Sequence, residues 1–130
     1  MSQTISDDFI KSVQVFSTGS GGQHLEHRYG SRLPSLWWGL TSKSWVEIPI
    51  NIYLFEHRNE LVLFDAGLDT AIGSDPNYVS SSIGRFFLHR LFRLHIGPDD
   101  TLTAKLNGLG YDVADVSKVI VSHLHFDHIG

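Results

Sequence analysis

The stretch that decides the fold is Lys118-Val-Ile-Val-Ser-His-Leu-His-Phe-Asp-His-Ile-Gly130, in which a β-branched run leads directly into three histidines and an aspartate. Residues 118–122 predict a strand, because β-branched residues favour extended backbone. His123, His125, Asp127 and His128 follow within six positions. Imidazole nitrogen and carboxylate oxygen are the usual zinc ligands, at about 2.0 to 2.2 Å. The stretch therefore predicts a strand that ends in a metal-binding loop.

The spacing inside this loop indicates two ions. Side chains two positions apart project to the same side at a strand end, so we expect His123 and His125 to hold one ion while Leu124 turns into the core. Asp127 and His128 fall beyond the turn, where we expect them to reach a second ion. With eight His in 130 residues, this pattern has a chance expectation of about two in a thousand.

These four residues match the signature of the metallo-β-lactamase superfamily. The preceding residues 102–122 resemble those of its N-acyl homoserine lactonase-like members. A second stretch supports the resemblance: residues 48–55 and the following Leu61-Val-Leu-Phe-Asp-Ala-Gly67 are similar to the family's paired strands with an Asp-x-Gly turn. The resemblance covers residues 12–130. It implies an α+β fold, namely the N-terminal half of an αββα sandwich.

The resemblance also has implications for the domain and the site. Members of this family add a further His, a bridging Asp and a last His from a C-terminal half, and none of these has a position before Gly130. We therefore expect residues 1–130 to be a single, truncated domain, the N-terminal part of a longer protein. Asp65 is expected to hydrogen-bond the metal-binding loop rather than the ion, because a ligating imidazole needs a partner on its other nitrogen.

The predicted chemistry is metal-assisted hydrolysis, in which hydroxide held on the metal attacks a carbonyl. We expect two zinc ions per complete domain, with iron, manganese or cobalt as alternatives, and a catalytic role for Asp127 in orienting the nucleophile. The resemblance implies a small-molecule lactone, such as an acyl homoserine lactone, as substrate. A thioester hydrolase of the hydroxyacylglutathione hydrolase type, a di-iron redox protein and a non-catalytic metal-binding fragment stay open as alternatives.

Composition excludes other classes. The chain has no cysteine, so neither a disulfide framework nor a thiolate ligand is available. A formal charge of −4 argues against a nucleic-acid partner. The first 30 residues show no basic region followed by an apolar run, and no stretch reaches the length of a membrane helix, so a cytoplasmic location is expected.

The N-terminal third contains a predicted strand and a long loop. Residues 12–16 alternate like a strand, and the glycine-rich residues 17–22 are expected to end it. Residues 23–44 are read as an irregular loop that contains His24 and His27, which we expect to be solvated. In this loop Trp37 and Trp38 are a candidate apolar platform for substrate, with plugging of the core as the equal alternative.

The central part predicts strands and two helices. Residues 45–55 and 61–65 read as two strands buried on both faces. Ser80 to Ser82 cap an expected helix that carries apolar residues and arginines as far as Leu94. We expect this helix to pack on the core. A lid or a homodimer seam is the second alternative, and we do not expect the helix to bind a membrane. A short helix follows residues 98–101.

Overall fold

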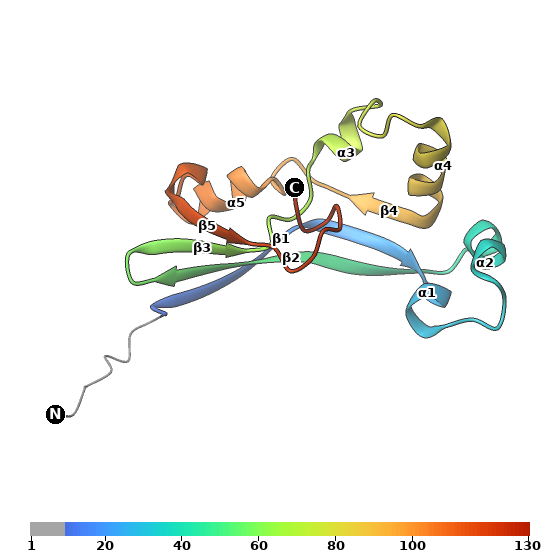
Figure 1. The fold of residues 1–130 in the computed structure, drawn as a ribbon, viewed down its shortest axis with the longest axis horizontal. Coiled ribbons are helices and arrows are strands. Elements are labelled where there is room, and N and C mark those ends of the chain that lie inside the picture. Colours follow the sequence, from blue (N-terminus) through green and yellow to red (C-terminus); the bar gives the residue numbers. More distant parts are fainter. Residues whose placement is uncertain (1–9) are drawn as a thin grey trace.

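A computed structural model describes residues 10–130 and shows a single five-stranded sheet with short helices around it (Figure 1). The strands follow the order β4-β1-β2-β3-β5, and all neighbours are antiparallel except β3 and β5. The elements are β1 (Ser12–His24), α1 (Leu25–Tyr29), α2 (Ser35–Thr41), β2 (Trp45–His57), β3 (Glu60–Phe64), α3 (Ala71–Ser74), α4 (Ser82–Leu91), β4 (Phe92–His95), α5 (Leu102–Gly108), the 3-10 turn η1 (Val113–Asp115) and β5 (Val116–Ile120).

The core lies on one face of the sheet. Ile52, Leu54 and Leu63 alternate along β2 and β3 and are almost fully buried against Leu106 of α5. A second cluster, Ile50, Leu68 and Ile72, lies toward α3 and α4. Figure 1 shows α3, α4 and α5 on the same side of the long β1–β2 ribbon. Burying such side chains contributes about 1.5 to 3 kcal/mol each.

Burial along β2 and β3 is one-sided, and in this respect the sequence prediction is wrong. Tyr53 on β2 is paired with Val15 on β1, and both remain exposed on the opposite face, as does Val13. In the described residues these strands therefore follow the alternation of a sheet with one covered face.

The strand β1 runs through the glycines that were expected to end it. Its register with β2 shifts between Ser17 and Ser20, where Gly19 adopts φ +117°. A Cβ on Gly22 would lie 3.1 Å from the Cβ of Arg93 on β4. The glycines thus form a bulge and let β4 pair closely, which are typical uses of glycine within a strand.

Two other predictions are wrong in detail. Residues 25–41 contain the helices α1 and α2 instead of only irregular chain. The helix that begins after the Ser81 cap ends at Leu91, and residues 92–95 form β4 against β1. The α5 helix begins after Thr101 as predicted, with the Thr101 hydroxyl accepting from the Ala104 N–H.

Candidate metal centre

The candidate site lies where two parallel strands end. Asp65 directly follows β3, and Ser122 lies two residues after β5. Parallel pairing brings these carboxyl ends to the same edge of the sheet, where the Asp65 N–H donates to the Ile120 carbonyl at 2.8 Å. The fold thus joins the Asp-x-Gly turn to the histidine-rich loop.

The Asp65 carboxylate is the organising group of this junction. It accepts hydrogen bonds from the Ser122 backbone N–H at 2.7 Å and from the Ser122 hydroxyl at 3.0 Å. Nδ1 of His128 lies 2.7 Å from its Oδ2. The side chain is 6% exposed. Burial alone would raise the pKa of this carboxyl, but the hydrogen bonds from Ser122 and His128 hold the pKa below its ordinary value.

The backbone of the turn is held in an unusual conformation. Asp65 has φ 65° and Gly67 has φ 82°, and left-handed backbone costs a non-glycine residue on the order of 1 kcal/mol. The Ala66 N–H donates to the His128 carbonyl at 2.9 Å, and the Gly130 N–H donates to the Gly67 carbonyl at 3.0 Å. Two backbone hydrogen bonds therefore hold the Asp-x-Gly turn against the histidine-rich loop.

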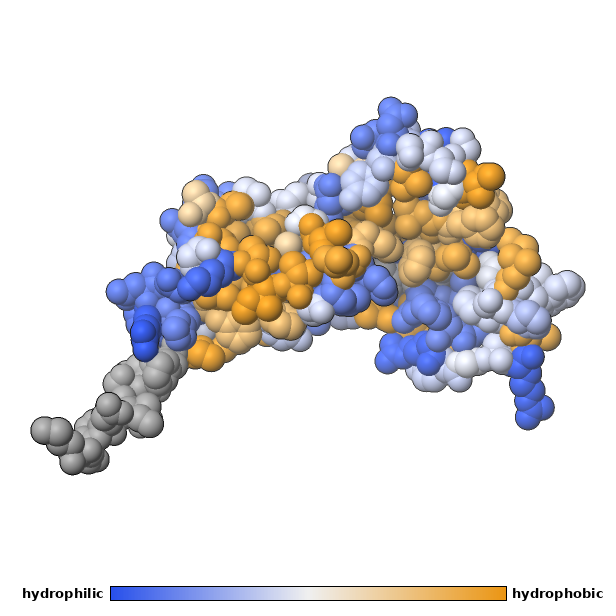
Figure 2. Space-filling model, viewed as in Figure 1, coloured by the Kyte–Doolittle hydropathy of each residue, from blue (hydrophilic) through white to orange (hydrophobic). Residues whose placement is uncertain are grey.

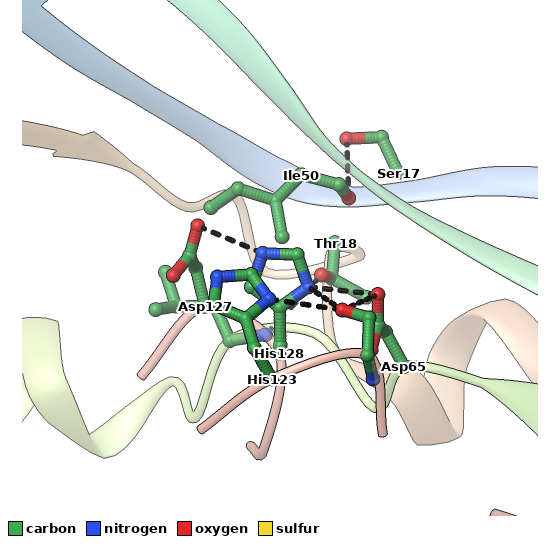
Figure 3. Close-up of polar contacts among 9 residues, drawn as sticks. Ser17, Thr18, Ile50, Asp65, His123, Asp127 and His128 are labelled. Atoms are coloured by element: carbon green, nitrogen blue, oxygen red, sulfur yellow. Dashed lines mark hydrogen bonds and ion pairs between the residues drawn. The ribbon is translucent and has the colours of Figure 1, made fainter. Parts of the chain in front are cut away.

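The three imidazoles of the loop lie together, and Figure 3 shows two of them, His123 and His128. The His123 ring centroid is 4.3 Å from that of His125 and 4.1 Å from that of His128. His128 Nδ1 faces the Asp65 carboxylate and is placed to donate to it, which turns Nε2 to the opposite side of the ring, where a ligating nitrogen would be needed. That Nε2 lies 3.4 Å from Oδ2 of Asp127.

This last distance has a direct chemical meaning. Two ligands at about 2.1 Å from a tetrahedral ion lie about 3.4 Å apart, so Asp127 and His128 stand at the separation of two ligands of one ion. Within residues 10–130, no group of three or more His, Asp or Glu side chains is positioned to hold an ion. The donors of the described residues thus fit a divalent metal in chemistry and come as pairs rather than as a closed set.

Exposure differs across the loop. Asp127 and His128 are partly buried, whereas His123 and His125 are exposed. Leu124 is 83% exposed, so the prediction that it turns into the core is wrong. Phe126 takes that role, because it packs beside the Ile50 cluster and against Phe92 with ring centroids 5.6 Å apart.

Ser122 is a site residue that the sequence analysis did not single out. Its hydroxyl lies 3.0 Å from Nδ1 of His123 and also donates to Asp65. One carboxylate therefore orients two imidazoles, His128 directly and His123 through the serine. The available signal in the sequence was a hydroxyl residue immediately before the His-x-His pair.

A pocket of about 300 Å³ opens beside the loop. His125 and Asp127 form one wall, and Gln23 and His27 add polar groups from β1 and α1. The remaining walls are mostly apolar: Ile48, Pro49 and Ile50 of β2, and Phe92 and Leu94 of β4. Pockets with an apolar lining and a few polar groups at one end are typical of small-molecule sites.

The predicted platform residues lie on α2, outside the lining of this pocket. Trp37 is 60% exposed, and Trp38 packs edge-on against His24 with ring centroids 5.7 Å apart. A role for either in contacting substrate stays a prediction. His24 is fully buried, 3.9 Å from the Trp45 ring, so the expectation that it is solvated is wrong. His27 is exposed as expected.

Comparison with known proteins agrees with this geometry. A family model described as the metallo-beta-lactamase superfamily matches residues 45–130. The chain belongs to the metallo-beta-lactamase superfamily. It is 30% identical over 84 residues to the N-acyl homoserine lactonase AttM of Azorhizobium caulinodans, covering 65% of this chain and 30% of that protein. It is 32% identical over 129 residues to the metallo-hydrolase mfmC of Annulohypoxylon moriforme, covering 94% of this chain and 30% of that protein.

Solved structures of lactonases share this fold. An N-acyl homoserine lactone hydrolase with N-hexanoyl-L-homoserine at its catalytic metal centre aligns with a TM-score of 0.70 at 20% identity, covering 92% of this chain and 43% of that one. AidC, a dizinc quorum-quenching lactonase, aligns with a TM-score of 0.52 at 19% identity, covering 94% of this chain and 39% of that one. The chain thus spans less than half of each of these relatives, and the α+β fold predicted from the sequence is confirmed.

Proposed function

We propose that the protein is a metal-dependent hydrolase that opens the ester bond of a small lactone with an acyl tail. The observation that carries the proposal is the Asp127–His128 donor pair at 3.4 Å, set beside an apolar pocket that begins at Asp127. The names of the similar lactonases support this substrate class. The apolar walls suit the acyl tail, and the polar end lies where the ester would meet the donors.

The residues proposed to hold the metal are His123, His125, Asp127 and His128, with zinc as the first candidate and iron, manganese or cobalt as alternatives. When bound, such an ion lowers the pKa of water and polarises a carbonyl. The chain's own residues orient the ligands: Asp65 fixes the tautomer of His128, and Ser122 fixes the ring of His123. Asp127 is the candidate for positioning the attacking group.

The test uses the natural gene product that contains these 130 residues, loaded with zinc. We expect ring opening of N-acyl homoserine lactones, followed by mass spectrometry, and loss of turnover on chelation with recovery when zinc is returned. Turnover of thioesters without turnover of lactones would assign the protein to the thioesterase alternative. Metal binding without hydrolysis of either substrate would contradict the proposal.

Replacing Asp65 with Ala is expected to weaken metal affinity by about 10- to 100-fold, because a ligand histidine loses the partner that orients it. Asp65→Asn separates the loss of the carboxylate charge from strain in the turn, since asparagine tolerates the left-handed backbone but lacks the charge. Ser122→Ala removes one link of the network and should have a smaller effect. Competition with a chromophoric chelator measures all three variants. Unchanged affinity in Asp65→Asn would contradict the orienting role.

A further inference from the structure

Helices α2 and α4, which are far apart in the sequence, lie side by side. A Cβ on Gly39 of α2 would lie 3.1 Å from Cδ2 of Leu91 on α4. Leu36 and Leu40 from α2 and Phe87 from α4 line a groove of about 220 Å³ between the helices. We call the surface formed by these helices and the groove the α2–α4 face.

The α2–α4 face is unusually apolar for an exposed surface. Helical spacing puts Ile83, Phe86 and Phe87 on one side of α4, while Leu88 on another side packs toward the core. Ile83 is 71% exposed and Phe86 is 56% exposed, and hydrophobic residues cover the surface over α4 (Figure 2). Contiguous exposed apolar surface of this kind marks an interaction site.

The two chain segments that form this face are rich in basic residues, and Glu26 lies at their edge, where its carboxylate accepts from the Ser42 hydroxyl. Residues 27–46 and 76–98 contain six of the ten Lys and Arg residues of the chain and none of its 14 Asp and Glu residues. A protein with a formal charge of −4 thus has a cationic end. The fold creates this end, because it places the α2 segment beside the α4 segment.

The arginines of this end keep their charge uncompensated. Arg85 donates to the Pro76 carbonyl, and Arg90 donates to the carbonyls of Leu40 and Ser42. Arg93 lies over the Trp45 ring, 4.3 Å from its centroid. Across residues 10–130, no salt bridge joins any of these three guanidinium groups to a carboxylate.

We propose that the α2–α4 face seats on the surface of a lipid bilayer that carries anionic headgroups. Apolar side chains that share α4 with Arg85 and Arg90 match the boundary between acyl chains and phosphate groups, and an exposed tryptophan such as Trp37 is typical of that depth. No helix among the described residues has the length and hydropathy to cross a bilayer. The contact is therefore one in which the protein lies on the membrane.

The α4 sequence taken alone favours packing over membrane binding, because its polar side is not continuously cationic. The structure places α2 beside α4, and residues 27–46, the segment that contains α2, carry Arg28, Arg32 and Lys43 and no acidic residue. A second copy of the chain fits the face less well. A two-fold dimer would set the same cationic surface against itself, and like charges repel.

The test is co-flotation of the natural gene product with vesicles. We expect the protein to float with vesicles of equal parts phosphatidylglycerol and phosphatidylcholine, to remain in the soluble fraction with phosphatidylcholine alone, and to be released by high salt. Ile83→Ser with Phe86→Ser should reduce the bound fraction about tenfold or more. Arg28→Glu with Arg32→Glu should do the same through charge.

The matched control is Leu109→Ser with Val113→Ser, which removes exposed apolar side chains from the segment after α5 and should leave flotation unchanged. Equal flotation with both kinds of vesicle, or none with either, would overturn the proposal. A dimer in light scattering that the Ile83→Ser, Phe86→Ser variant dissociates would also overturn it, because a second copy would then occupy the face. The proposal does not depend on hydrolase activity.

Discussion

Replacing Asp127 with Ala is expected to abolish lactone opening and to lower the metal content from about two ions to about one per chain. Asp127 is the only acidic residue of residues 118–130, and its Oδ2 lies 3.4 Å from Nε2 of His128. Removing it leaves that nitrogen without a second donor at ligand distance. The loss falls on the ion that Asp127 and His128 are proposed to share.

The fold should survive this change. Asp127 is only partly buried, and within residues 10–130 its carboxylate pairs only with the neighbouring His128. Metal content by atomic emission, turnover and melting temperature are measured together, with Asp99→Ala as the control because Asp99 is an exposed carboxylate outside the loop. Turnover in Asp127→Ala within a few-fold of the parent protein would refute the assigned role.

Replacing Gly67 with Ala is expected to destabilise the fold by about 3 kcal/mol or more, through overpacking added to backbone strain. Its φ is 82°, and a Cβ there would lie 2.3 Å from Oγ1 of Thr18 and 2.7 Å from Cδ1 of Ile52. Both neighbours are fully buried, so neither has space to move away. The Asp-x-Gly turn would have to move away from β1 and β2 to make room for the added Cβ.

Two other glycines separate the causes. Gly110 shares the left-handed backbone, with φ 85°, but a Cβ there meets nothing within 4 Å, so Gly110→Ala should cost only about 1 kcal/mol. Gly108, at the end of α5, has neither restriction, and Gly108→Ala should be neutral or stabilising by up to about 1 kcal/mol. Urea midpoints measure all three variants. A Gly67→Ala midpoint equal to that of Gly110→Ala would exclude the steric contribution.

The sequence was informative where chemistry and local pattern coincide. Strand β5 and the loop that follows it were predictable because ligand spacing and β-branched residues lie in one short stretch. Asp65 was assigned to the loop from a resemblance, and the structure places its carboxylate against Ser122 and His128. The metal ligands of the loop, the identity of the metal and the substrate remain predictions.

What the sequence did not indicate depends on contacts between distant segments. The glycines of residues 17–22 are local strand breakers, yet they remain in β1 because β2 and β4 pair on its two sides. His24 has a polar side chain, yet its ring is buried between Trp38 and Trp45. Phe92 belongs to the helical pattern of α4, and pairing with Gln23 takes it into a strand instead. In each case a tertiary contact overrides a local preference.

The hydrogen bonds between Asp65 and Ser122 span 57 residues, and this separation determines when the site can exist. Parallel strands pair only after the whole crossover between them has been made, and contacts of such long range form late. During synthesis, Asp65 leaves the ribosome long before the imidazoles that it will orient. A nascent chain therefore exposes its histidines in an unaligned state until β5 docks on β3, so binding of the proposed metal would have to follow translation of this segment.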